Sequence, residues 1–413
     1  VDSLSQQKPL KIALSKIDLR NFDIAYGSES TKLDAKLQFT KLQTEVKKIN
    51  LDQNDYALGN IVVDGLILRL NQDIVEEVAS TIKEENPTKT NPFKIQLQKI
   101  DLSNFDVFYD NKASKMKAEV IFEQLNTNIK KIDLEKNQFV VDNIDLENAK
   151  INFGMFSLPN TNKNVTTPTK ETENTPLDVL LNKINLQNVA VIYNNNAVKK
   201  TNQGVDFNHL NFSKIDLKLK DLVFNSKNIT GEITEAFLSE KSGLQVNKFQ
   251  TKFAYAEREA YLKNLYLQTP KTLIQDQLVL NFDSQDQLTK DLGKVTIFAN
   301  LPKTKVAFSD ILLLVPSLKN TPPFNKYPQA VLAIDSKLNG KINDLNISKL
   351  QVSGIGNTII NANGKIKNAM NPDKLFFDLK INQFTSTSKD VENILPKGTL
   401  PANIQLPAQF NVK

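Results

Sequence analysis

The chain has no cysteine, no tryptophan and a single histidine, His209, among its 413 residues. Without cysteine it can form no thiol nucleophile, no thiolate-bound zinc site and no iron–sulfur cluster. One histidine cannot supply the two or three imidazoles of most catalytic zinc sites, and a Ser-His-Asp triad would have to be built around His209. That residue lies in an alternating segment, Gly204–Phe212, which predicts an ordinary strand position. We therefore expect a protein that is not an enzyme and that needs no metal or cofactor.

Arginine is also scarce. The formal net charge is +6, but only Arg20, Arg69 and Arg258 accompany the many lysines. Proteins that read nucleic acids rely on arginine for bidentate contacts to bases and phosphates, and here the lysines are spread along the chain. We expect no nucleic-acid partner. The lysines indicate solvated outer faces of a sheet, with weak attraction to an anionic membrane surface left open.

Long apolar runs are missing as well. No stretch reaches the roughly 18 consecutive apolar residues of a transmembrane helix. The first residues, Val1–Gln7, have neither the basic nor the apolar region of a signal peptide, and the chain does not begin with Met. We expect a mature form or an internal piece of a longer protein. The lack of cysteine is consistent with a periplasmic protein.

What the chain does have is an internal repeat. Residues 11–70 align without a gap to residues 94–153, and about two positions in five are identical. Lys16-Ile17-Asp18-Leu19 matches Lys99-Ile100-Asp101-Leu102, and a third copy begins at Lys183-Ile184-Asn185-Leu186. Self-similarity at a fixed period is typical of an extended array rather than of one globular core.

Each repeat contains a shorter unit centred on an Asn or a Gly. The centres are Asn21, Gly65, Asn104, Asn148 and Asn188, spaced 39 to 44 residues apart. Apolar residues precede each centre by two and four positions and follow it by one, three and five positions. The apolar candidates that we expect to share one face, as a hydrophobic groove, are Leu19, Phe22, Ile24, Leu102, Phe105, Val107, Leu146, Ile151, Leu186, Val189 and Val191.

The alternation predicts strands, but its parity changes at each centre. In an unbroken strand this change would move the second apolar set to the opposite face. A β-bulge or sharp bend at the Asn or Gly, residues that tolerate a left-handed backbone, would keep both sets on one face. The prediction is therefore an all-β, elongated repetitive sheet curled into a taco-like groove. A closed β-sandwich filled by the same residues is the alternative, and the repetition favours the open array.

The repeat is interrupted three times. Asp73–Glu85 has the period of a short amphipathic helix ended by Asn86-Pro87, and Asn160–Pro176 is polar enough to be a disordered loop. Phe308–Leu318 predicts one or two helical turns, capped by Ser309 or Asp310 and limited by Pro316, packed in the core or covering the groove. We divide the chain into a first β-repeat at 1–70, a helix and linker at 71–93, a second β-repeat at 94–159, a disordered loop at 160–176, a third repeat with continuing sheet at 177–305, a short helix at 306–320 and a further β-segment at 321–413.

The remaining motif candidates indicate structure rather than chemistry. Gly354-Ile355-Gly356-Asn357 has no third glycine and no following helix pattern, so it predicts a turn between two strands. The acids in the Ile-Asp-Leu segments, such as Asp18 and Asp101, alternate with apolar residues and are expected to face solvent.

Three segments carry a resemblance to a known family. They are Val306–Pro316, Leu338–Ile347 and Lys389–Pro401. The region that contains them, residues 306–401, is about a quarter of the chain. These segments resemble motifs of the TamB (translocation and assembly module) family in its Bacteroidetes form, within the AsmA-like bridge-like lipid transfer proteins. The resemblance implies a long taco-shaped sheet with an apolar inner wall. It also implies a periplasmic location, an inner-membrane anchor in a segment outside this chain, and docking at an Omp85-type outer-membrane protein.

The function implied is the shielding of phospholipid acyl chains between the inner and outer membranes, in support of outer-membrane assembly. Phospholipid is then the expected ligand, with an Omp85-family protein as partner through parts outside this chain. Two other classes of protein remain open. One is a holdase for unfolded outer-membrane polypeptides, which would bind them by strand addition at a sheet edge. The other is a purely structural β-spacer with a filled core.

Overall fold

A computed structural model describes residues 14–51, 53–74, 93–155, 176–395, 399 and 403–412. It is 66% strand and 8% helix, which confirms the expected all-β class. The chain divides into two compact units. The first comprises residues 1–199 with 223–226, and the second comprises residues 200–222 with 227–413.

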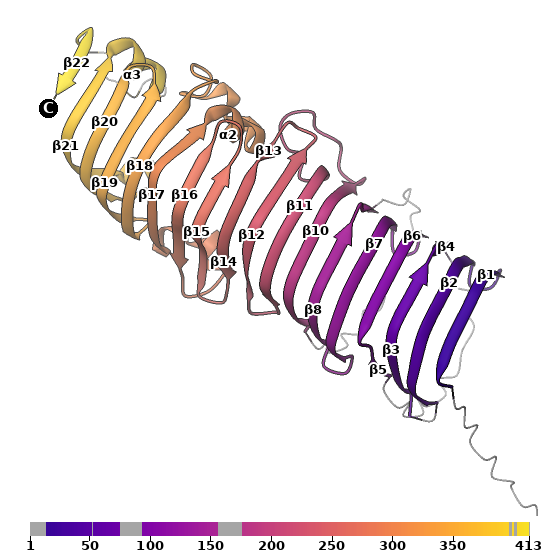
Figure 1. The fold of residues 1–413 in the computed structure, drawn as a ribbon. Coiled ribbons are helices and arrows are strands. Elements are labelled where there is room, and N and C mark those ends of the chain that lie inside the picture. Colours follow the sequence, from indigo (N-terminus) through magenta and orange to yellow (C-terminus); the bar gives the residue numbers. More distant parts are fainter. Residues whose placement is uncertain are drawn as a thin grey trace, which may run out of the picture. The chain divides into compact units, whose positions relative to one another are not determined.

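The first unit is a single layer of curved strands (Figure 1). Its strands are β1 (Lys16–Ser28), β2 (Leu33–Asn50), β3 (Asp55–Asp64), β4 (Ile67–Gln72), β5 (Lys94–Gln96), β6 (Lys99–Asn111), β7 (Met116–Asp133), β8 (Gln138–Glu147), β9 (Lys150–Met155) and β10 (Asp178–Asn195). β1, β2 and the pair β3–β4 form an antiparallel meander, which β6, β7 and the pair β8–β9 repeat. The sequence repeat is therefore a repeat of three long strands.

Successive repeats are joined by parallel pairing. β3 and β4 pair with β5 and β6, and β8 and β9 pair with β10. A parallel partner requires a crossover connection that returns the chain to the starting end of the sheet. The two interruptions expected as helix and disordered loop fall in these connections. Apart from Asp73, Ile74 and Pro176, both lie outside the described residues.

All five Asn and Gly centres have a left-handed backbone, as expected for sharp bends. Their φ angles are 51° at Asn21, 68° at Gly65, 51° at Asn104, 50° at Asn148 and 52° at Asn188. The alternative prediction, a bulge with one extra residue, is wrong at these positions.

The strand pairing stays in step across each centre. Arg20 pairs with Lys41 and Phe22 with Phe39, which leaves a single residue, Thr40, opposite Asn21. No residue is left over, so neighbouring strands bend along one common row and need no bulge there.

This row of bends makes a testable prediction. Asn21→Gly should leave the free energy of unfolding nearly unchanged, because glycine adopts positive φ without a steric cost and the Asn21 amide has no hydrogen-bond partner among the described residues. Asn21→Val should lower it by about 1–2 kcal/mol, because a β-branched residue resists the left-handed region. Urea denaturation of both variants checks the difference. Equal stability of the two would contradict the bend.

The second unit is an antiparallel layer with short helices at strand ends. Its strands are β11 (His209–Phe224, the last two residues falling in the first unit), β12 (Ile229–Glu240), β13 (Gln245–Val246), β14 (Lys248–Tyr255), β15 (Glu259–Gln268), β16 (Leu273–Asn281), β17 (Thr296–Ala307), β18 (Val331–Lys341), β19 (Asp344–Ile355), β20 (Thr358–Lys367), β21 (Phe376–Thr387) and β22 (Gln409–Val412). From β14 to β22 each strand pairs with the next. The turn expected around Gly356 joins β19 to β20 and is confirmed.

Short helices interrupt this layer. They are α1 (Gln287–Lys290), η1 (Leu292–Lys294), α2 (Phe308–Leu314), η2 (Pro316–Asn320), η3 (Pro372–Lys374) and α3 (Ser388–Ile394). The helix expected at 308–318 is confirmed as α2 and η2, which meet at Val315. Capping by Ser309 or Asp310 is wrong, because Ala307 occupies the N-cap and no side chain caps α2.

The carboxylate of Asp310 instead ties α2 to the β15–β16 turn. It accepts hydrogen bonds of 2.6 Å from the hydroxyls of both Thr269 and Thr272. The carboxylate of Asp390 in α3 does the same at the β19–β20 turn, where it accepts from the backbone N–H of Asn357 (3.0 Å). Side-chain hydrogen bonds thus connect α2 to the β15–β16 hairpin and α3 to the β19–β20 hairpin.

Candidate functional site

The apolar residues of the first unit form continuous rows across its strands. Directly paired residues lie on the same face of a sheet, so register defines each row. One row runs through Leu19, Leu42, Val63, Leu102, Leu125, Leu146 and Leu186. We call it the leucine row. It crosses the unit without a polar residue.

Two further rows lie on the other side of the bends. The valine row consists of Ile24, Leu37, Leu68, Val107, Val120, Ile151 and Val191. Next to it, the tyrosine row consists of Tyr26, Ala35, Leu70, Tyr109, Ala118, Phe153 and Tyr193. Both rows are apolar or aromatic at every strand.

Aromatic stacking fills the row nearest the bends. The rings of Phe22 and Phe39 stack with centroids 4.9 Å apart, and those of Phe105 and Phe122 stack at 4.5 Å. Val189 lies on the same side of its centre as these rings and is only 1% exposed. The bend therefore brings enough side chains together to bury the bottom of the face without a second sheet.

All eleven predicted groove residues fall in these rows, and they differ in burial. Val189 is buried, whereas Leu19 (43%) and Ile24 (49%) are exposed in the edge strand β1. The other eight are half-buried. A filled sandwich core would bury such residues almost completely, so this intermediate burial favours an open face.

The opposite face of the first unit is mostly polar. Arg69 donates to Asp106 at 2.6 Å, and Lys150 lies 3.3 Å from Glu119. These residues alternate with the valine row along their strands, as Asp106 does with Val107. On the far side of the bend, Gln43 donates to Asp18 at 2.8 Å beside the leucine row. Because the polar pattern changes parity together with the apolar one, we infer that the leucine and valine rows share one face.

The second unit has equivalent rows, which the looser versions of the repeat unit around Asp221, Asn264 and Lys349 indicate only in part. One consists of Gly231, Phe253, Leu262, Leu278, Ala299, Leu338, Ile347, Gly364 and Leu379. Another consists of Ile229, Tyr255, Ala260, Leu280, Ile297, Gly340, Leu345, Ile366 and Phe377. The sequence signal for these rows was the alternation of apolar and polar residues within each strand. The strands differ in length and in the position of their bulges, so the register between neighbouring strands could not be assigned from the sequence.

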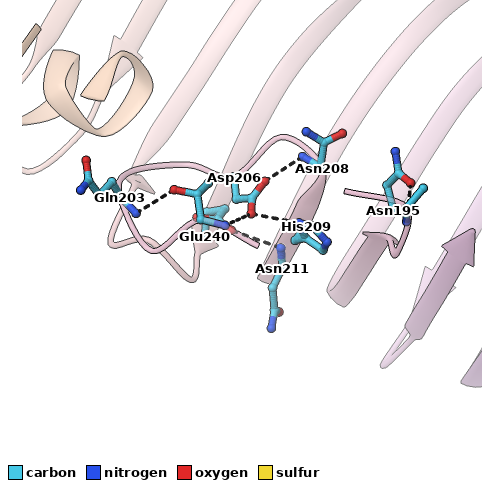
Figure 2. Close-up of polar contacts among 9 residues, drawn as sticks. Asn195, Gln203, Asp206, Asn208, His209, Asn211 and Glu240 are labelled. Carbon is cyan, nitrogen blue, oxygen red and sulfur yellow. Dashed lines mark hydrogen bonds and ion pairs between the residues drawn. The ribbon is translucent and has the colours of Figure 1, made fainter. Parts of the chain in front are cut away.

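The single histidine lies at the start of β11. The expected strand over Gly204–Phe212 is wrong for its first half, which is a loop and turn ending at His209. The Nδ1 atom of His209 lies 2.9 Å from Asp206 Oδ2, and Figure 2 shows the two side chains facing each other. The Asp206 carboxylate also accepts hydrogen bonds from the backbone N–H groups of Thr201 and Asn208.

These contacts hold His209 to the turn between residues 201 and 208. No hydroxyl hydrogen-bonds its ring in the described residues, and the buried Ser242 hydroxyl has no hydrogen-bond partner. The same part of the chain contains no cluster of three or more His, Asp or Glu residues that could bind a metal. Nor does any of its helices have the length and apolar character to cross a membrane.

The hydrogen bonds of Asp390 in α3 are expected to weaken in acid. A hydrogen bond from the Tyr327 hydroxyl (2.7 Å) lowers the pKa of Asp390 below its ordinary value of 3.8, and donors from Asn357 and Thr387 add to this against the effect of burial. Because the folded pKa is depressed, the stabilisation is present above pH 3.8 and is lost as pH falls through the lower folded value.

Asp390→Asn should therefore lower the free energy of unfolding at pH 7 by about 2 kcal/mol and reduce its decline below pH 4. Urea denaturation at pH 7 and pH 3 measures both effects. Glu392→Gln, which alters an exposed acid of the same helix, is the control. A pH dependence in Asp390→Asn identical to that of the parent would contradict the role of the carboxylate.

Comparison with known proteins gives no relative from which a function could be transferred. The chain matches no family model, no curated protein and no solved structure.

Proposed function

We propose that the apolar face of this protein shields the acyl chains of phospholipids as they pass between two membranes. The observation that supports this most directly is the set of uninterrupted, half-exposed apolar rows. In the first unit the leucine, valine and tyrosine rows cross from β1 to β10 with no charged residue.

An apolar face lowers the free-energy cost of exposing lipid acyl chains to water. Each exposed methylene costs about 0.8 kcal/mol, so two acyl tails in water carry a very large penalty. A face of many interchangeable Leu, Ile, Val and aromatic side chains removes much of that penalty at every position along a row. No position is strongly preferred, so a tail can slide and no catalytic group is needed.

The cellular setting of the proposal rests on the resemblance to the TamB family. We place the protein in the periplasm, anchored in the inner membrane by a segment outside this chain. Lipid would pass between the inner and outer membranes in support of outer-membrane assembly. An Omp85-family protein would be the docking partner through parts outside this chain.

Photo-crosslinking tests which molecule occupies the face. A photoreactive residue at Phe105 or Ile151, both in the apolar rows, should capture phospholipid in cells. The matched controls are Phe108 and Asn152, each in the same strand but on the opposite face. Capture of unfolded polypeptide alone at Phe105 and Ile151 would favour the holdase. Absence of any adduct would favour a structural spacer.

A further inference from the structure

Strand β1 has an edge that its equivalents in the later repeats use for parallel pairing. β1 matches β6 and β10 in sequence: Lys-Ile-Asp-Leu starts at residue 16 in β1 and at residue 99 in β6, and Lys-Ile-Asn-Leu starts at residue 183 within β10. β6 is flanked by β3–β4 in parallel, and β10 by β8–β9 in parallel. Among the described residues β1 pairs only with β2, and it lies at one end of its layer (Figure 1).

The hydrogen bonds of β6 and β10 indicate which backbone groups of β1 point to its open edge. At the first parallel join the Ser103 carbonyl accepts from the Gly65 N–H at 3.0 Å, and the Asp106 N–H donates to the Leu66 carbonyl at 2.8 Å. The second join repeats both bonds at Gln187 and Ala190. The same positions in β1 are Arg20 and Asp23, whose carbonyl and N–H therefore point to the open edge.

A side-chain contact marks the same place. The amide Nδ2 of Asn104 donates to Asp64 Oδ1 at 2.8 Å, and that of Asn188 donates to Asn148 Oδ1 at 2.6 Å. Each bond joins the left-handed residue of one strand to an oxygen beside the bend of its parallel neighbour. The corresponding amide of Asn21 has no such partner in the part of the chain that the structure describes.

The apolar side chains of β1 are also uncovered. Leu19, Ile24 and Tyr26 are 43%, 49% and 56% exposed. Their equivalents in β6, which have a parallel neighbour, are half-buried. β1 contains no proline and pairs regularly with β2, so neither a proline nor a bulge blocks its edge.

We propose that the open edge of β1 binds a further strand in parallel, of the kind formed by β3–β4. The occupant is an extended segment with apolar residues at alternate positions and a left-handed Asn or Gly at its bend. A side-chain oxygen at or next to that bend accepts from Asn21. Its apolar residues continue the leucine, valine and tyrosine rows past Leu19, Ile24 and Tyr26. This proposal concerns a protein partner and does not depend on the ligand of the apolar face.

The test uses a synthetic peptide of residues 55–72, the sequence of β3–β4, added to the whole chain. The chain has no cysteine, so single cysteines report the register cleanly. By equivalence with the pairing of Arg69 and Phe108, Ala25→Cys should form a disulfide with a peptide carrying Arg69→Cys. It should not react with a peptide carrying Val62→Cys, which a parallel register places near Asp18.

Peptide affinity supplies the second readout. Asp64→Ala in the peptide should weaken binding roughly tenfold, because the Asn21 amide loses a charged acceptor. With Asn21→Ala in the protein, the same peptide change should have little effect. Circular dichroism establishes that both protein variants are folded.

Four results would overturn the proposal. They are no saturable binding, equal binding of a scrambled peptide, preferred cross-linking to Val62→Cys, and a disulfide between two Ala25→Cys chains in place of one to the peptide. The last would identify a second copy as the occupant.

Discussion

Val107→Asp is expected to leave the protein folded while slowing lipid transfer along the apolar face. Val107 lies in the valine row and is half-buried, so an introduced carboxylate reaches water and the free energy of unfolding falls by only about 1 kcal/mol. A tail passing the hydrated site exposes about two methylenes. That costs about 1.6 kcal/mol, roughly a tenfold loss of rate. Transfer of labelled phospholipid between vesicles measures this loss, and urea denaturation measures stability.

Phe108→Asp is the matched control for this variant. Phe108 follows Val107 in β6 and faces the polar side, where Lys117 lies 5.0 Å from its ring and Arg69 is its paired neighbour. An acid there lies beside Arg69 and Lys117 as well as Glu119, its other paired neighbour. It does not touch the apolar rows, so transfer should continue at the parental rate. Unfolding of Val107→Asp would indicate a filled core. A folded Val107→Asp with undiminished transfer would indicate that tails do not follow the valine row.

Val189→Asp is expected to have the larger effect on stability, although it also lies beside the apolar rows. Val189 is 1% exposed at the bottom of the bend, so its carboxylate could reach neither water nor a partner. An unpaired buried charge costs about 3–5 kcal/mol, enough to unfold a marginally stable unit. Circular dichroism and thermal denaturation measure the loss.

The adjacent substitution Ala190→Asp provides the comparison. Ala190 pairs with Lys150 on the polar face, so the new acid meets a cation and stability should change little. Comparable stability of Val189→Asp and Ala190→Asp would contradict the difference in burial between the two faces.

The sequence predicted the features that depend on local chemistry. Left-handed backbone at Asn21, Gly65 and the other centres followed from two local signals, the residue type and the change in parity. The place of the eleven apolar candidates in rows along their strands followed from the same alternation. Both signals lie within a single strand, so no knowledge of strand partners was required.

Features that depend on pairing between distant strands were not predictable. The parallel joins of β3–β4 to β6 require register information that no single strand contains. For the same reason the sequence could not decide between a bulge and a sharp bend at Asn21, where the pairing with β2 shows no extra residue. In the second unit, the left-handed backbone at Asp221 and Asn264 occurs at residue types that favour it, whereas at Lys214 and Lys303 the residue type gives no such signal. Asp310 has the sequence position of a cap, and only the fold shows Thr269 and Thr272 as its partners.

The central claim is that the half-exposed apolar rows hold acyl chains. Mass spectrometry of lipids that remain bound after gentle purification tests it most directly, with Val107→Asp and Phe108→Asp purified in parallel. We expect phospholipid to co-purify with the parent chain and with Phe108→Asp, and the amount bound to Val107→Asp to be clearly lower. Parent protein that is folded and free of lipid, or an equal amount bound to all three, would contradict the account.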